Sequence, residues 1–66
     1  MQILVNGDPL ILPPGSSVQA LLEQLDLQGR RVAVELNHDI VTRSEHATRI
    51  LQPDDRVEIV HAIGGG

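Results

Sequence analysis

The sequence has 66 residues, which is enough for one domain, and its formal net charge is −4. It contains no cysteine, which excludes disulfide bonds and thiolate metal ligands. It also lacks aromatic residues, on which unpaired bases stack, and its negative charge repels a phosphate backbone, so we expect no nucleic-acid partner.

The sequence predicts neither a secretory leader nor a membrane span. The N-terminus has no basic stretch that leads into a long apolar run. No apolar run approaches the length needed to cross a bilayer. We therefore expect a soluble cytoplasmic protein with no membrane partner.

Two short strands joined by a hairpin are predicted first. Residues 2–6 have the pattern of a half-buried strand. Asn6-Gly7-Asp8 is a hairpin signal, because Asn and Gly tolerate the positive φ that tight hairpin turns need. The second strand is expected at residues 10–12, and Pro13 ends it because proline cannot donate to a sheet.

An amphipathic helix is predicted next. Apolar side chains recur at the spacing of one helical face, at Val18, Leu21, Leu22 and Leu25. Either Ser16, in a capping box with Gln19, or Ser17 can cap the N-terminus of this helix. Gly29 lies beyond the stripe as a loop residue or as a C-terminal stop.

The rest of the chain predicts four strands, two turns and one helical turn. The strands are expected at residues 32–37, 40–41, 50–51 and 56–63. The turns are expected at residues 37–39 and 53–55, and the helical turn near residues 44–47.

This order of elements predicts an α+β fold. A lone hairpin cannot protect its apolar face, whereas a sheet packed on one amphipathic helix can. We therefore predict a β-grasp, ubiquitin-like fold with a mixed sheet of four to five strands packed on one main helix. The β-grasp domain is expected to span residues 1–63, and residues 64–66 are expected to form a flexible reactive glycine tail.

The three glycines of this tail are the strongest functional signal. Without side chains, the tail can enter a narrow active-site channel of a partner. From Ile63 the tail would reach roughly 13 Å if extended. We expect Gly64 and Gly65 to thread such a channel and the carboxylate of Gly66 to react. Adenylation by ATP would turn that carboxylate into a mixed anhydride, which a sulfur nucleophile converts into a thiocarboxylate. A disordered chain end without chemistry is the alternative interpretation.

No cluster of side chains predicts catalysis or a metal site. His38, His46 and His61 lack a metal-ligand spacing, and we expect surface or interface roles for them. The pair Asp54-Asp55 is expected to form a turn rather than a general acid–base couple. We therefore predict a protein that is no enzyme, has no bound cofactor, and is acted on by partner enzymes.

A docking patch for those partners is predicted on one face of the sheet. If Ile3 and Val57 face the helix, then Leu4, Val60 and Ala62 lie on the opposite face. A small apolar patch beside the reactive tail suits docking. Scattered exposed aliphatic side chains, which are normal on protein surfaces, are the alternative.

The whole chain resembles the sulfur-carrier family of thiamin biosynthesis, the ThiS family. The resemblance rests on residues 1–7, 17–22, 34–43 and 54–66, and the segment 54–66 is the most specific. Two positions depart from the family pattern. Thr42 stands where many relatives have proline, and Ala20 stands where many have an acidic residue.

The resemblance implies a β-grasp fold and a Gly66 that is adenylated and then converted to a thiocarboxylate. Gly65 and Gly66 match the family's terminal diglycine, and Gly64 matches the longer glycine tail of some members. It also implies two partners: a ubiquitin-activator-like adenylating enzyme that consumes ATP, and thiazole synthase as the sulfur acceptor. We further expect a sulfur donor enzyme as a partner.

Three other functions remain open at the level of sequence. The small subunit of molybdopterin synthase shares the fold and the tail chemistry but is usually longer. A protein modifier would be joined through Gly66 to lysines of its targets. A passive β-grasp interaction module would use the tail for no chemistry.

Overall fold

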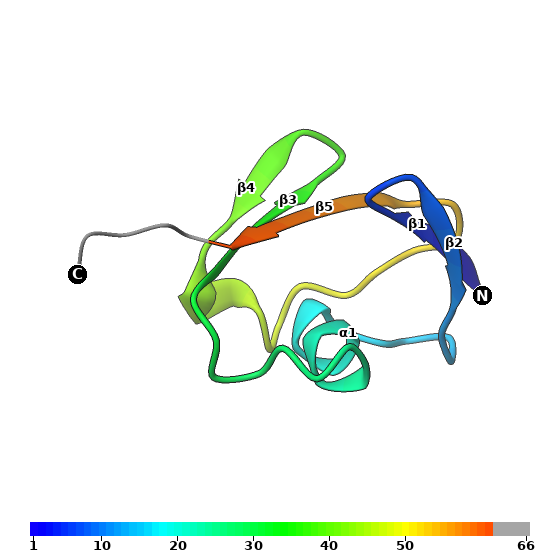
Figure 1. Cartoon of the computed structure of the whole chain (residues 1–66). Coiled ribbons are helices and arrows are strands. Elements are labelled where there is room, and N and C mark those ends of the chain that lie inside the picture. The colour runs from blue at the N-terminus through cyan, green and yellow to red at the C-terminus, as the bar shows by residue number, and fades with distance from the viewer. Residues whose placement is uncertain (62–66) are drawn as a thin grey trace.

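Five strands form one mixed sheet in the order β2-β1-β5-β3-β4, and the helix α1 covers one face of it (Figure 1). The structure is a computed structural model that describes residues 1–61. Its elements are β1 (Gln2–Val5), β2 (Asp8–Ile11), α1 (Val18–Gln24), β3 (Val32–Leu36), β4 (Asp39–Val41), the 3-10 helix η1 (Arg43–Glu45) and β5 (Arg56–His61). β1 and β5 run parallel, and the other neighbours are antiparallel. The predicted α+β, β-grasp fold is confirmed.

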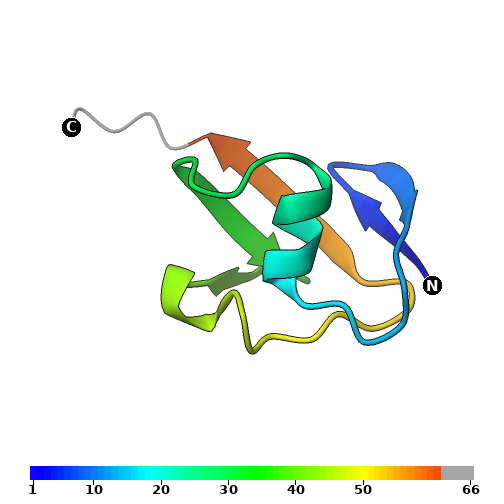
Figure 2. The same ribbon diagram turned by 90° about the horizontal axis from the view of Figure 1, so that it is seen from below.

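The core lies between α1 and the sheet, as the view from below shows (Figure 2). Its fully buried members are aliphatic and come from strands, helix and loops alike: Ile3, Leu12, Val18, Leu21, Val34, Leu51 and Val57. The predicted helical stripe is confirmed, with Leu25 half-buried against this core. In a chain without aromatic residues, burial of branched aliphatic side chains must provide the hydrophobic stabilisation.

Two hairpins of the same geometry connect the strand pairs. Each has a two-residue turn, because Val5 pairs with Asp8 and Leu36 pairs with Asp39. Both central residues have positive φ in each turn, at Asn6-Gly7 and at Asn37-His38. This type I′ geometry matches the twist of the flanking strands and explains the asparagine at the first turn position.

Ser17 is the N-cap of α1. Its Oγ accepts a hydrogen bond from the N–H of Ala20 at 3.1 Å, while the Oγ of Ser16 donates to the carbonyl of Pro13 at 2.7 Å. The helix ends at Gln24, and the left-handed residue beyond it is Asp26. Gly29 is therefore a loop residue rather than the helix stop.

The predicted strand at residues 50–51 is wrong. Ile50 forms one isolated bridge to Ser17, and the N–H of Leu51 donates to the carbonyl of Ser16 at 2.8 Å. This segment thus pairs with the start of α1 instead of with the sheet.

Smaller differences concern the ends of elements. β2 begins at Asp8, two residues before the predicted start, and Pro9 is tolerated because β2 is an edge strand. The helical turn η1 begins one residue earlier than predicted. Residues 62–63 of the predicted last strand lie outside the described residues. Among residues 1–61, no helix has the length and apolar character needed to cross a membrane.

Candidate functional site

β5 is the central strand of the sheet and leads toward the predicted reactive tail. It pairs with β3 over nearly its whole length, from Leu36 opposite Val57 to Val32 opposite His61. On the other side of β5, the strand β1 pairs only with Arg56 and Val57, the first two residues of β5. The far half of β5, which lies at the opposite side of the molecule from the N-terminus (Figure 1), therefore has one strand neighbour.

The side chain of Asn6 continues the pairing of β5 where β1 ends. Its Oδ1 accepts from the N–H of Ile59 at 2.8 Å, and its Nδ2 donates to the carbonyl of Ile59 at 3.1 Å. Its own backbone N–H donates to the carbonyl of Val57 at 2.9 Å. Asn6 thus satisfies both backbone groups of Ile59, just before the strand leads into the tail. Sequence analysis identified Asn6 only as a turn residue.

Asn37 plays a comparable part at the other end of β5. Its Oδ1 accepts from the N–H of Arg56 at 2.9 Å, and its Nδ2 donates to Oδ1 of Asp55 at 3.0 Å. The other oxygen of Asp55 accepts from the N–H of Gln52 at 2.7 Å. The predicted turn at Asp54-Asp55 is confirmed, and Asp55 organises it. Two asparagines from equivalent hairpin positions therefore hold β5, Asn37 at its first residue and Asn6 at Ile59.

The predicted reactive residues Gly64, Gly65 and Gly66 lie outside the described residues, as does Ala62 of the docking patch. Their roles stay predictions. The described chain leads to them through His61, which is exposed and stands opposite Val32.

The other two docking residues share one face of the sheet. We call the face opposite α1 the outer face; the register places on it Leu4, Ala33, Glu35, Ile40, Arg56, Glu58 and Val60. Val60 is 59% exposed, whereas Leu4 is half-buried. Leu4 stands opposite Arg56, so Val60 lies four residues farther along, about 13 Å by the rise of a strand. The structure thus places Leu4 and Val60 on the same face but at different ends of β5.

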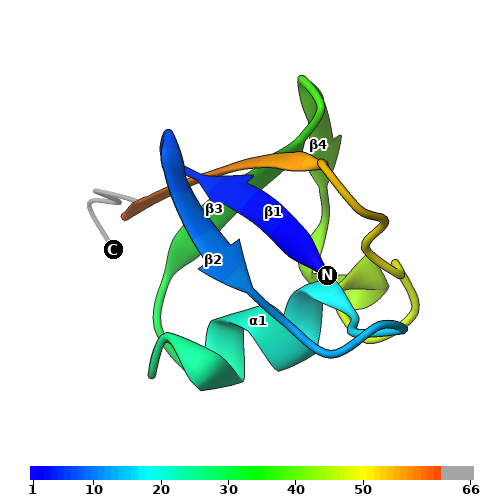
Figure 3. The same ribbon diagram turned by 90° about the vertical axis from the view of Figure 1, so that its right-hand side faces the viewer.

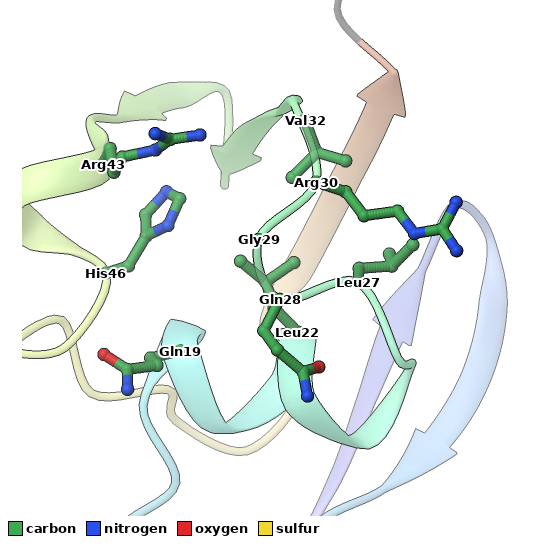
Figure 4. A pocket seen from close by; sticks show the side chains of 9 residues that line it. All are labelled: Gln19, Leu22, Leu27, Gln28, Gly29, Arg30, Val32, Arg43 and His46. Atoms are coloured by element: carbon green, nitrogen blue, oxygen red, sulfur yellow. The ribbon is translucent and has the colours of Figure 1, made fainter.

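A hollow of about 330 Å³ lies near the end of β5, because Val32 both lines it and pairs with His61 (Figure 4). Arg30, Arg43 and His46 line it, and no carboxylate of residues 1–61 does. The guanidinium of Arg30 points away from the Arg43 and His46 side chains in Figure 4. Because the side chain of Arg30 diverges from those of Arg43 and His46, we assign no anion site to the hollow.

The predicted surface positions of the histidines are confirmed for His38 and His61, which are exposed. His46 is half-buried, and its Nε2 lies 3.3 Å from the carbonyl oxygen of Val41, to which it donates a hydrogen bond when protonated. Within residues 1–61, no group of three or more His, Asp or Glu side chains could hold a metal ion.

Glu45 is the one described group with a clearly shifted pKa. The Oγ1 of Thr42 donates to Oε1 of Glu45 at 2.8 Å, and the N–H of Thr42 donates to the same oxygen at 3.3 Å. These two bonds favour the carboxylate and lower the pKa of Glu45. Proline, which many relatives are expected to have at position 42, has neither donor.

Comparison with known protein families identifies the family to which this chain belongs. The model of the ThiS family matches residues 3–66. The chain belongs to the ThiS family. Sulfur carrier protein ThiS of Escherichia coli K12 is 38% identical over 66 residues, with 100% of both chains covered.

A solved ThiS structure has the same fold. The crystal structure of thiamine biosynthesis protein ThiS from Geobacter metallireducens matches with a TM-score of 0.86, at 32% identity and with 100% of both chains covered. A ThiS-family β-grasp is therefore confirmed in sequence and in architecture.

Other relatives are much longer than this chain. A thiazole synthase from Magnetococcus marinus is 41% identical over 66 residues, and one from Paramagnetospirillum magneticum is 39% identical over the same span. The chain spans only 20% of the length of each of these two proteins.

Proposed function

We propose that this chain is the sulfur carrier for assembly of the thiazole ring of thiamin. The observation that carries this proposal is its match over the full length of the E. coli sulfur carrier protein ThiS. The fold supports it, because asparagine side chains hold the central strand β5 at Arg56 and Ile59, and Gly64, Gly65 and Gly66 follow this strand in the sequence.

The proposed chemistry takes place at the carboxylate of Gly66. A carboxylate oxygen attacks the α-phosphorus of ATP on an adenylating enzyme, and pyrophosphate leaves. Sulfide (HS⁻) released by a donor enzyme then attacks the carbonyl carbon and AMP leaves. Loss of the remaining proton yields the thiocarboxylate. Gly64 and Gly65 let the tail enter the partner's channel as bare backbone. Because activation consumes ATP, we expect the cytoplasm as its location.

In this scheme the chain is a protein co-substrate and not an enzyme. It supplies the reactive atom and a docking surface, and its partners supply the catalytic groups. We propose thiazole synthase as the enzyme that accepts the sulfur. Two long relatives with that name contain a segment homologous to the whole of this chain, which supports a functional connection between the two.

One added residue tests whether Gly66 reacts. The wild-type chain, incubated with the adenylating enzyme and ATP, is expected to drive release of pyrophosphate. A variant with one alanine after Gly66 is expected to lose this activity, because the carboxylate is displaced from its site. Equal activity of both chains would contradict the proposal.

Further readouts separate the remaining alternatives. A protein modifier would form covalent adducts of higher mass with other proteins, whereas a carrier stays mostly unconjugated. A small subunit of molybdopterin synthase would pass its sulfur to a molybdopterin precursor. The proposed carrier would pass it to the thiazole instead, in an assay with thiazole synthase.

A further inference from the structure

Two glutamates face each other across neighbouring strands on the outer face. Glu35 of β3 stands directly opposite Glu58 of β5 in the antiparallel register. Side chains in such pairs have Cβ atoms about 4.5–5.5 Å apart, and like charges directly opposite each other destabilise a sheet. This pair therefore costs the free chain some stability.

Among the paired strand residues within 1–61, the register places one arginine, Arg56, on the same face near this pair. Arg56 precedes Glu58 by two residues on β5, so it lies about 7 Å farther along the strand. One arginine cannot neutralise two carboxylates, and it lies to one side of them. The pair thus keeps a net negative charge at the centre of the sheet.

Apolar side chains surround the two carboxylates. Ile40 stands opposite Glu35 on β4 and is 64% exposed. Val60, two residues after Glu58, is 59% exposed, and it stands opposite the exposed Ala33. Exposed apolar side chains can be buried on docking. A charge that the free chain leaves unneutralised favours a partner of opposite charge.

We propose that Glu35 and Glu58 together bind an arginine of the adenylating enzyme, with Ile40 and Val60 packed around that contact. This inference rests on the proposed function. A planar guanidinium has five donors and can bond both carboxylates, whereas an ammonium group is a point charge. When the arginine of the adenylating enzyme binds, its positive charge offsets the repulsion between the two glutamates.

The location of the pair supports this partner. Glu58 lies on the strand that leads to the tail, eight residues before Gly66. An extended chain of that length spans at most about 29 Å. An enzyme that holds Gly66 in its active site therefore lies within reach of the sheet around β5, and it binds the chain before any other proposed partner.

Two variants test this proposal on the full chain with the adenylating enzyme. Glu35→Gln and Glu58→Gln keep the size of each side chain and remove its charge. Each is expected to weaken binding about tenfold, since a hydrogen bond to a charged group contributes roughly that much. Titration calorimetry at two salt concentrations measures this, and the salt dependence of Kd is expected to decrease as well.

Stability of the free chain is the second readout. Both variants are expected to melt at the same temperature as the wild type or higher, because the repulsion is relieved. A merely structural glutamate would instead lower the melting temperature when it is replaced. Glu23→Gln is the matched control: Glu23 is exposed on α1, which packs on the opposite face, and its replacement is expected to leave Kd unchanged.

The outcomes separate this inference from the proposed function. If the wild-type chain is adenylated but both variants bind as tightly as it does, the arginine contact is wrong and the carrier function stands. If tenfold weaker binding appears only with thiazole synthase, the proposal is also overturned, because the occupant is then another enzyme. If the wild-type chain is not adenylated at all, both the inference and the proposed function fail.

Discussion

The helix α1 covers one face of the sheet and leaves the other uncovered (Figure 3). Ile3, Val34 and Val57 are buried on the inner face. On the outer face Glu58 and Val60 are exposed and Glu35 is half-buried. Both sets alternate along the same strands, so each strand contributes to both faces. In this chain of 66 residues, stability and the proposed recognition therefore depend on different side chains of the same strands. Inner residues are constrained by packing, and outer residues are free to match a partner.

The largest loss of free energy of unfolding is expected from a substitution in the core beneath the inner face. Leu21 of α1 is fully buried, and Leu21→Ala is expected to lower the free energy of unfolding by about 3 kcal/mol, through lost burial and the cavity left behind. Urea denaturation followed by circular dichroism measures this in a chain without aromatic residues. Ile11→Ala, at an exposed position of the edge strand, is the matched control and is expected to change stability by less than about 0.5 kcal/mol. Equal effects of the two substitutions would break the comparison.

The second-largest loss of free energy of unfolding is expected in the plane of the sheet, when Asn6 is replaced. Asn6→Gly keeps the positive φ of the turn and removes both hydrogen bonds to Ile59. We expect a loss of about 2 kcal/mol, as for two hydrogen bonds, and faster hydrogen exchange of the Ile59 amide. Unchanged exchange at Ile59 would show that Asn6 does not hold the strand. Asn6→Ala adds the strain of positive φ and is expected to cost more.

A smaller effect on stability, with a clear effect on binding, is expected on the outer face. Val60→Ala is expected to change the free energy of unfolding by less than about 0.5 kcal/mol, because the side chain is exposed. If Val60 is buried on docking, the loss of its methyl groups weakens binding of the adenylating enzyme roughly tenfold. Ile50→Ala, at an exposed loop position, is the control. A destabilised Val60→Ala with unchanged affinity would reverse the comparison.

The smallest effect on stability is expected away from both faces of the sheet, from the hydrogen bonds of Glu45. Its pKa is lowered in the folded chain, first by the hydrogen bond from the Thr42 hydroxyl. The resulting stability is therefore present above the ordinary pKa of glutamate and is lost as pH falls through the lowered folded value. Thr42→Val removes the hydroxyl, so an NMR titration should show the pKa of Glu45 moving back toward its ordinary value. An unmoved pKa would contradict this cause.

Local patterns in the sequence predict most of the elements. The stripe of Val18, Leu21 and Leu22 defines α1. Asn6-Gly7 has both residues that type I′ geometry favours, and Asn37 provides the first of them in the second turn. These features depend on side chains within a few positions of each other, which is why periodicity reveals them.

Contacts between distant residues could not be predicted in this way. The hydrogen bonds of Asn6 join it to Ile59, 53 positions later, and no local pattern indicates them. The wrong prediction of a strand at residues 50–51 also arises from a distant contact, because this segment pairs with the start of α1 and not with the sheet. That Glu35 and Glu58 face each other can likewise be known only from the register of β3 on β5. The roles of Gly64, Gly65 and Gly66 rest on family membership and stay predictions.

The intact mass of the chain tests the central claim most directly. The chain is purified from its own host, with and without the adenylating enzyme, under sulfur-replete conditions. The account predicts a gain that corresponds to one oxygen replaced by sulfur, that depends on this enzyme and that maps to Gly66. An unchanged mass in the presence of active enzyme and ATP would contradict the assignment as a sulfur carrier.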